Sequence, residues 1–137
     1  MIPSAQGVDS TIPLAPLLLT VLSMAGAAVA LVLMGVHGAK RRVPPNDFFG
    51  IRTRFTRSGD AAWYAVHEAS ARWSILAGIA FLPAAILTPL ISDPKGQVAA
   101  ILIPATVGTG LLLVGSWRAH RVARRRLARE EGRADPP

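Results

Sequence analysis

Residues 14–42 read LAPLLLTVLSMAGAAVALVLMGVHGAKRR. The part from 14 to 36 is 23 residues long and has no charged side chain. A helix of this length can cross a hydrocarbon layer about 30 Å thick. Lys40, Arg41 and Arg42 follow directly, and positive charge after an apolar run is typical of a span that stops in the membrane. We predict that residues 14–36 form a transmembrane helix that the mature protein keeps.

Two further apolar runs, at about 73–91 and 98–117, also lack charged residues. The turn-forming residues Ser92–Gly96 separate them, so the two helices are expected to be antiparallel neighbours. A soluble helical bundle is the alternative, but amphipathic helices carry charges on one face and these runs carry none. The sequence therefore predicts an all-α integral membrane protein with three transmembrane helices.

The composition supports this class, with 51% hydrophobic and 17% charged residues, against about 25% charged in a soluble domain. The net charge of +7 could suggest nucleic acid as a partner. However, fourteen of the fifteen Lys and Arg residues fall in two blocks, Lys40–Arg72 and Arg118–Arg133, directly beside apolar spans. Such blocks set membrane orientation, so no nucleic-acid partner is expected. The chain has no cysteine, which excludes disulfides and thiolate chemistry.

The positions of the charges predict the orientation in a cell membrane. Seven Lys and Arg residues lie between the first two spans and seven follow the third, whereas residues 1–13 have none and the 92–96 turn has one. Positively charged segments stay in the cytoplasm. We predict a multi-pass protein with an extracytoplasmic leader at 1–13, its N-terminus outside, and a basic cytoplasmic tail at 118–137. This tail is expected to continue the third helix, to favour anionic lipids at the cytoplasmic face and to finish in a disordered end at 135–137.

Small residues spaced four apart are candidates for close packing between the spans. No ionisable residue lies inside a span, which argues against a transporter or pump working alone. The packing candidates are Gly26 with Ala30, Ala80 with Ala84, and Ala105 with Thr109, with Gly108, Gly110 and Gly115 nearby.

The segment from 45 to 73 is the chemically varied part of the chain and holds six of its eight aromatic residues. Pro44 and Pro45 prevent the first helix from continuing. Asn46 suits a turn, and Gly50 permits a backbone conformation that a side chain would forbid. Residues 51–56 alternate like a strand but have no partner strand, so we expect an extended loop at the lipid headgroups, with Phe48, Phe49 and Phe55 dipping inward.

A short interfacial helix is expected next, starting near residue 61 and running into the second span. Ser58 and Asp60 are both candidate N-caps. Along this helix Trp63, His67 and Ser70 share one face, while Glu68 can pair with Arg72 on another.

His67 is the natural candidate for chemistry, but a general base needs a nucleophile and an orienting carboxylate, and a metal ligand needs partners at suitable spacing. Neither set is evident, so we expect no catalytic residue, metal or other cofactor, and a role in hydrogen bonding or partner recognition instead. Arg52 could bind phosphate or carboxylate, or could pair with Asp47 or Asp60. Asn46 is interpreted as a turn residue.

The loop resembles the signature of the SdpI family, membrane proteins named for immunity to a secreted sporulation-delaying toxin. The resemblance covers about 14–117, which would form one SdpI-like domain, and it departs at Arg54 and Ala71, where relatives often have Pro and Gly. Longer relatives carry an additional membrane module before this unit, so we expect a short three-span form. The match includes the block Gly50-Ile51-Arg52-Thr53. The residues that the resemblance implies act in partner or lipid recognition are Asn46, Gly50, Arg52, Thr53, Thr56, Ser58, Trp63 and His67.

The resemblance implies a non-enzymatic protein of the immunity or signalling type, with the loop binding lipid headgroups or another membrane or cytoplasmic protein. One alternative is an accessory subunit of a larger membrane complex. A weaker alternative is a headgroup-modifying enzyme that uses His67, Arg52 and Asn46.

Overall fold

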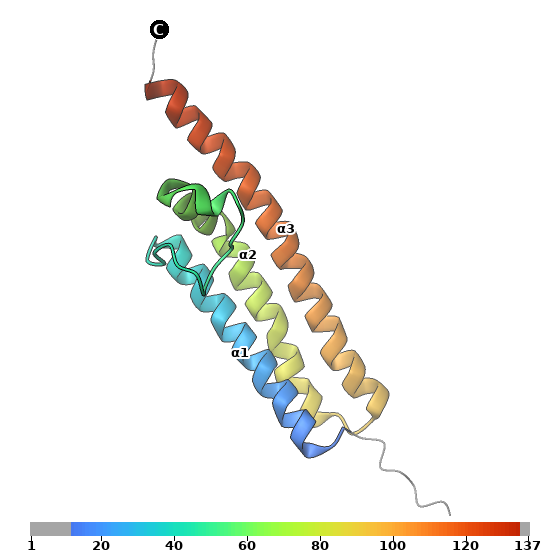
Figure 1. Cartoon of the computed structure of the whole chain (residues 1–137). Helices are drawn as coiled ribbons and strands as arrows, with labels where there is room; N and C mark the ends of the chain where they lie inside the picture. Colours follow the sequence, from blue (N-terminus) through green and yellow to red (C-terminus); the bar gives the residue numbers. More distant parts are fainter. Residues whose placement is uncertain (1–11, 135–137) are drawn as a thin grey trace, which may run out of the picture.

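The computed structural model describes residues 12–134, and over this range it contains helices, turns and loops but no strand. Three helices, α1, α2 and α3, are long and apolar enough to cross a membrane (Figure 1). Their bounds are Leu14–Ala39, Asp60–Leu87 and Pro94–Ala134, and two 3₁₀ turns, η1 (Thr56–Ser58) and η2 (Thr88–Leu90), lie between them. The prediction of an all-α protein with three spans is confirmed. Most of the predicted leader and the end at 135–137 lie outside the described residues.

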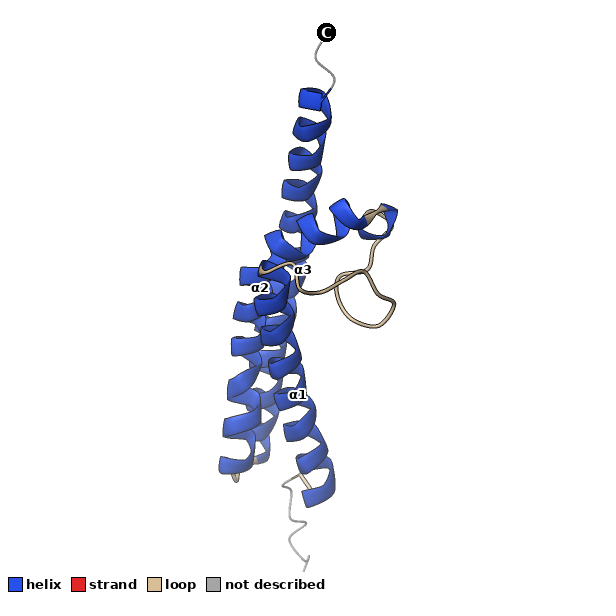
Figure 2. Ribbon diagram, turned by 90° about the vertical axis from the view of Figure 1, so that its left-hand side faces the viewer, coloured by secondary structure: helices blue, strands red, loops and turns tan. Residues whose placement is uncertain are grey.

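Helix α2 is the centre of the bundle. It packs against both α1 and α3, which within the described residues do not contact each other (Figure 1). The basic tail continues α3 as a helix to Ala134, as predicted. The loop between α1 and α2 lies at the same end of the bundle as this tail, and Figure 2 shows it projecting to one side. The two basic blocks are therefore together at one end.

Glycines allow α1 and α2 to approach closely. A methyl group added to Gly35 would lie 2.6 Å from the carbonyl oxygen of Ala71, and one added to Gly78 would lie 2.7 Å from that of Ala28. Small residues at helix crossings allow such contact between backbones. The resulting van der Waals packing is one of the forces that associate helices in lipid.

Two of the glycines singled out in the sequence, Gly108 and Gly115, pack against the rings of Phe81 and Trp73 on α2. The expectation for Gly26 is wrong within this bundle, as it is for Gly110, because a methyl group at either position would meet no atom within 4 Å. Spacing along a helix does not say which face meets the neighbour.

The helix ends differ in detail from the predictions. Helix α3 begins at Pro94 rather than near 98, because Asp93 caps it: the Asp93 carboxylate accepts a 2.7 Å hydrogen bond from the Gly96 N–H. Ser58 and Asp60 do not cap α2. Gly59 occupies the N-cap position without a side-chain bond, and the Ser58 hydroxyl donates to the carbonyl of Phe55 instead, at 2.7 Å.

Helix α1 ends in an unusual way at Arg41, which has a φ of 53°. The Arg41 N–H bonds the Gly38 carbonyl at 3.1 Å and the Arg42 N–H bonds the His37 carbonyl at 2.9 Å. This is the Schellman pattern that usually places a glycine in the left-handed position. Here an arginine occupies it.

Candidate functional site

His67 attaches the loop to α2. Its side chain is 2% exposed. One ring nitrogen, Nδ1, lies 2.8 Å from the carbonyl oxygen of Trp63, and the other, Nε2, lies 2.9 Å from the backbone nitrogen of Ile51. Because a carbonyl only accepts and a backbone N–H only donates, Nδ1 carries the proton and Nε2 accepts. Both ring nitrogens are therefore occupied by backbone groups.

The same surroundings keep His67 neutral. Burial lowers the pKa of His67 from its usual 6.5, the hydrogen bond to the Trp63 carbonyl opposes this, and electrostatic repulsion from His120, when that ring carries a proton, lowers the pKa further. His67 lies outside the uncharged run at 73–91 that is predicted to cross the membrane. Protonation would place a second N–H against the Ile51 N–H and break the bond that holds the loop.

Gly50 fits against this histidine. Its φ of +118° lies in the region that favours glycine, as expected from the sequence. A methyl group at Gly50 would overlap Nε2 of His67 and lie 3.2 Å from Cη2 of Trp63. The glycine is thus needed both for its backbone angle and for its lack of a side chain.

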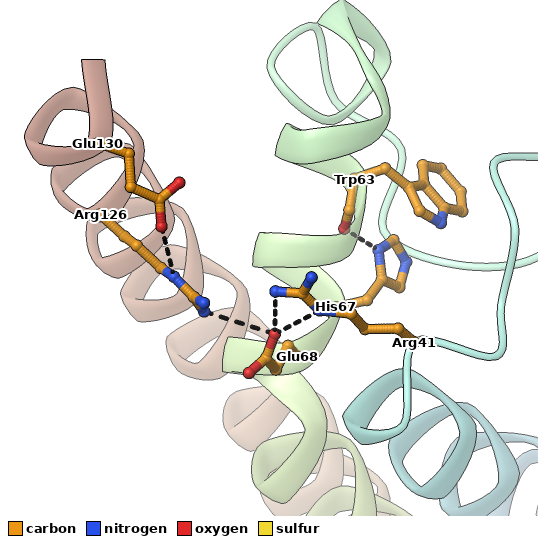
Figure 3. A network of polar contacts seen from close by, with 6 residues as sticks. All are labelled: Arg41, Trp63, His67, Glu68, Arg126 and Glu130. Carbon is orange, nitrogen blue, oxygen red and sulfur yellow. Dashed lines mark hydrogen bonds and ion pairs between the residues drawn. The ribbon is translucent and has the colours of Figure 1, made fainter. Parts of the chain in front are cut away.

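Trp63 completes this attachment. Its indole stacks on the His67 ring with a centroid distance of 4.3 Å. Figure 3 shows the two side chains next to each other. The indole N–H donates a 2.9 Å hydrogen bond to the carbonyl of Val43, at the start of the loop. Ser70 is also buried, and its hydroxyl donates to the His67 carbonyl at 3.2 Å. The predicted shared face of Trp63, His67 and Ser70 therefore turns inward.

A second attachment joins the loop to α3, and the sequence did not suggest it. The Thr53 hydroxyl lies 2.7 Å from Nε2 of His120, whose Nδ1 lies 2.7 Å from the carbonyl of Ser116. The Ser116 carbonyl accepts a hydrogen bond from Nδ1–H, so in the neutral imidazole Nε2 accepts from the threonine hydroxyl. His120 thus repeats the arrangement of His67, with one nitrogen on the carbonyl four residues earlier and the other on the loop.

Thr53 and Thr56 form a closed turn. The Thr56 hydroxyl accepts from the Thr53 N–H at 2.8 Å and donates to the Thr53 carbonyl at 3.1 Å. Thr56 is 1% exposed. These two matching residues bond mainly to each other and to His120.

Asn46 is a turn residue, as interpreted from the sequence. Its side-chain oxygen accepts from the N–H groups of Phe48 and Phe49 at 3.0 and 2.7 Å, and its amide donates to the Pro44 carbonyl at 2.9 Å. This turn presents Phe48 outward, 95% exposed. Phe55, in contrast, packs against a small buried cluster on α2 and α3.

The ion pairs differ from the sequence expectations. Arg52 is exposed and forms no pair with a carboxylate among residues 12–134, so the proposed pair with Asp47 or Asp60 is absent. Arg57 approaches Asp47 instead, at 3.8 Å.

Glu68 pairs with residues on both neighbouring helices rather than with Arg72 (Figure 3). Arg41, just after α1, is 3.0 Å away, and Arg126, on α3, is 3.5 Å away and also bonds Glu130 at 3.2 Å. The three helices are therefore joined at the base of the loop. These side chains are partly exposed, so their chief effect is on geometry.

The described residues contain no group of three or more His, Asp or Glu side chains arranged to hold a metal ion. Within the described part of the chain, no hydroxyl or carboxylate bonds either ring nitrogen of His67. The arrangement can fix a loop and present its outer surface.

Comparison with known families gave one finding: the model of the SdpI/YfhL protein family matches residues 42–116. The matched range starts where the loop leaves α1. It includes His67 and Thr53 but ends before His120. Comparisons with curated proteins and with solved structures gave no significant match.

Proposed function

The chain belongs to the SdpI/YfhL protein family, and we propose that it is a non-catalytic membrane protein of the immunity or signalling type whose loop recognises a partner at the cytoplasmic face. The partner is another protein or the headgroups of inner-leaflet lipids. The observation that carries this proposal is the fixation of the loop at three points: Trp63 on Val43, His67 on Ile51 and His120 on Thr53.

Fixation matters because a preformed surface loses little conformational entropy on binding. The buried residues of the family signature hold the loop from its inner side. The outer side of the loop is therefore available for contact. That outer side carries Phe48 and Arg52, with Arg54 and Arg57 nearby, all exposed. An aromatic ring and arginines are the residue types that most often contribute binding energy at protein interfaces.

A cytoplasmic position for the loop is supported by the charge distribution. The loop segment and the tail carry seven Lys and Arg residues each, and they lie at the same end of the bundle (Figure 1). The positive-inside rule then places the N-terminus outside and the C-terminus in the cytoplasm.

The enzymatic alternative has less support. A general base at His67 would need a nitrogen available to substrate, but both nitrogens are bonded to backbone. The ring nitrogens of His67 bond Ile51 and Trp63 rather than Arg52 or Asn46, and the Asn46 side chain is used in its own turn. Loss of a headgroup-modifying activity in His67→Gln, with an intact fold, would revive this alternative.

The accessory-subunit alternative is favoured by a different observation. Gly26 and Gly110 have open space where a side chain would lie, on helices whose outer faces are free in this bundle. Small residues on free faces allow another helix to approach closely. A chain that migrates alone after purification in mild detergent would count against this role.

The recognition proposal is tested by co-purification from cells, with proteins identified by mass spectrometry. The double variant Phe48→Ser, Arg52→Gln removes the outer surface of the loop. Leu90→Ser, Lys95→Gln is the matched control, because it removes one exposed apolar and one basic side chain at the opposite end of the bundle. We expect the first to lose the partner and the second to keep it. Equal retention by both would contradict recognition by the loop.

The immunity type of function is tested by survival under a panel of membrane-active peptides. Deletion should sensitise cells to at least one peptide, and the wild-type chain should restore resistance while the Phe48, Arg52 double variant should not. Unchanged sensitivity across the panel would leave signalling as the role to pursue.

A further inference from the structure

A hollow of about 500 Å³ lies between the loop and α3. Its basic lining residues are Arg54, Arg121 and Arg124, and its aromatic ones are Phe55 and Trp117. The Thr53–His120 bond is part of its wall, so the attachment of the loop to α3 shapes the hollow.

The arginines of this hollow are held but not neutralised. The Arg121 guanidinium carbon lies 3.9 Å from the centre of the Trp117 ring, and that of Arg124 lies 4.8 Å from the centre of the Phe55 ring. No carboxylate within residues 12–134 forms an ion pair with Arg54, Arg121 or Arg124. A guanidinium stacked on a ring keeps its N–H groups at the edge, where they match the oxygen atoms of phosphate.

The depth of the hollow relative to the membrane follows from Trp117. This residue is the last of the predicted span 98–117, and its ring is 54% exposed. Tryptophan rings concentrate at the level of lipid headgroups. The hollow therefore has an aromatic end at Trp117, at the level of the lipid headgroups, and a cationic end at Arg124, further along the tail.

We propose that this hollow binds one anionic phospholipid, with the phosphate on Arg121 and Arg124 and the start of the acyl chains against Trp117. The proposal rests on the proposed function, because it specifies the lipid that the loop would recognise at the cytoplasmic face. An occupant with both a negative head and an apolar tail matches both ends of the hollow, whereas a soluble anion matches one.

A second basic surface on α3 provides the comparison. It includes Arg129 and Arg133, lies further along the tail, and is lined by Glu130 and no aromatic residue. A general attraction between the tail and anionic lipid would use both surfaces, whereas a built site would use the hollow alone.

The test is native mass spectrometry of the full chain in detergent, titrated with phosphatidylglycerol or phosphatidylcholine. We expect one tightly held phosphatidylglycerol and no comparable phosphatidylcholine. Arg121→Gln, Arg124→Gln should weaken retention roughly thirtyfold, and Arg129→Gln, Arg133→Gln should leave it within about twofold. Equal losses in both double variants, or equal retention of the two lipids, would overturn the proposal.

Trp117→Ala provides a second variant, and inorganic phosphate provides a second probe. Loss of the aromatic wall should weaken phosphatidylglycerol retention several-fold, and inorganic phosphate should not displace the lipid. Complete displacement by phosphate, or full retention in Trp117→Ala, would show that the hollow does not select a lipid. Circular dichroism and gel filtration of each variant verify the fold.

The lipid site can fail without the recognition proposal failing. If lipid retention is unspecific but the Phe48, Arg52 double variant still loses a protein partner, only the lipid site is wrong. If neither lipid nor protein depends on the loop, the proposed function is wrong as well.

Discussion

The Nε2 atom of His67 accepts a 2.9 Å hydrogen bond from the backbone N–H of Ile51, sixteen residues earlier in the chain. This bond gives a structural reason why a glycine, an isoleucine and a distant histidine belong to the same family signature. Gly50 makes room for the imidazole, and Ile51 supplies the N–H. The pattern describes how a loop is attached to a helix.

His67→Ala should loosen the loop and destabilise the protein by about 3 kcal/mol, because it opens a cavity and leaves the Ile51 N–H without its acceptor. Thermal unfolding in detergent measures the stability, and tryptic cleavage after Arg52, Arg54 or Arg57 measures the opening of the loop. His37→Ala is the control, since among residues 12–134 the imidazole of His37 bonds only the Leu33 carbonyl of its own helix. Equal effects of the two substitutions would contradict the attachment.

The attachment should weaken in acid. The pKa of His67 is lowered in the folded protein, so the unfolded chain, with a His pKa near 6.5, takes up the proton first. The stabilisation by neutral His67 is therefore complete above about pH 6.5 and is lost as pH falls through the lowered folded pKa. The protection of the Ile51 amide against hydrogen exchange, measured relative to its intrinsic exchange rate at the same pH, should decrease in this range. His67→Gln should remove this extra dependence, and its persistence in that variant would assign it to another group.

Gly50→Ala should destabilise the protein by about 2 kcal/mol or more, since alanine is strained at a φ of +118° and its methyl group would overlap His67. Gly59→Ala is a close control because Gly59 has an extended backbone and open space around it. Thermal unfolding should separate the two variants clearly. Similar melting temperatures would mean that the loop does not pack as described.

Arg41 offers a prediction about the end of α1. Its φ of 53° is strained for any residue except glycine, while its side chain pairs with Glu68. Arg41→Gly and Arg41→Ala both lose the pair, but only glycine relieves the strain. We expect the glycine variant to be more stable than the alanine variant by about 1 kcal/mol. The reverse order would show that α1 does not end in a left-handed residue.

The packing of α1 on α2 predicts a contrast between two glycines. Gly78→Val should cost about 2 kcal/mol or more, because the added atoms meet the Ala28 carbonyl. Gly26→Val should cost little, since no atom lies within 4 Å of an added methyl group there. Detergent unfolding compares them. A large effect at Gly26 would instead indicate that another helix covers that face.

The helical class could be predicted because long uncharged runs have few alternatives. The positions of the three long helices follow from the runs at 14–36, 73–91 and 98–117, and Asn46 and Gly50 could be interpreted from their local backbone chemistry. Asp93 and Pro94 match a helix-start pattern, but the turn-forming residues around them equally favour a loop.

Contacts between distant residues could not be predicted. Thr53 meets His120 across 67 positions, and nothing local in either residue indicates this. Glu68 had Arg72 within reach on its own helix, yet it pairs with Arg41 and Arg126, because the three-helix packing brings those side chains closer to it. The choice of the glycines that face α2 likewise depends on how each helix is rotated.

The recognition role of the loop is tested most directly by photo-crosslinking in cells, with a photoreactive phenylalanine analogue replacing Phe48. The account predicts a crosslink to a cytoplasmic or membrane protein, or to inner-leaflet lipid, that Gly50→Ala abolishes and Gly59→Ala leaves intact. No crosslink at position 48, or one that is insensitive to Gly50→Ala, would contradict a recognition surface built by this loop.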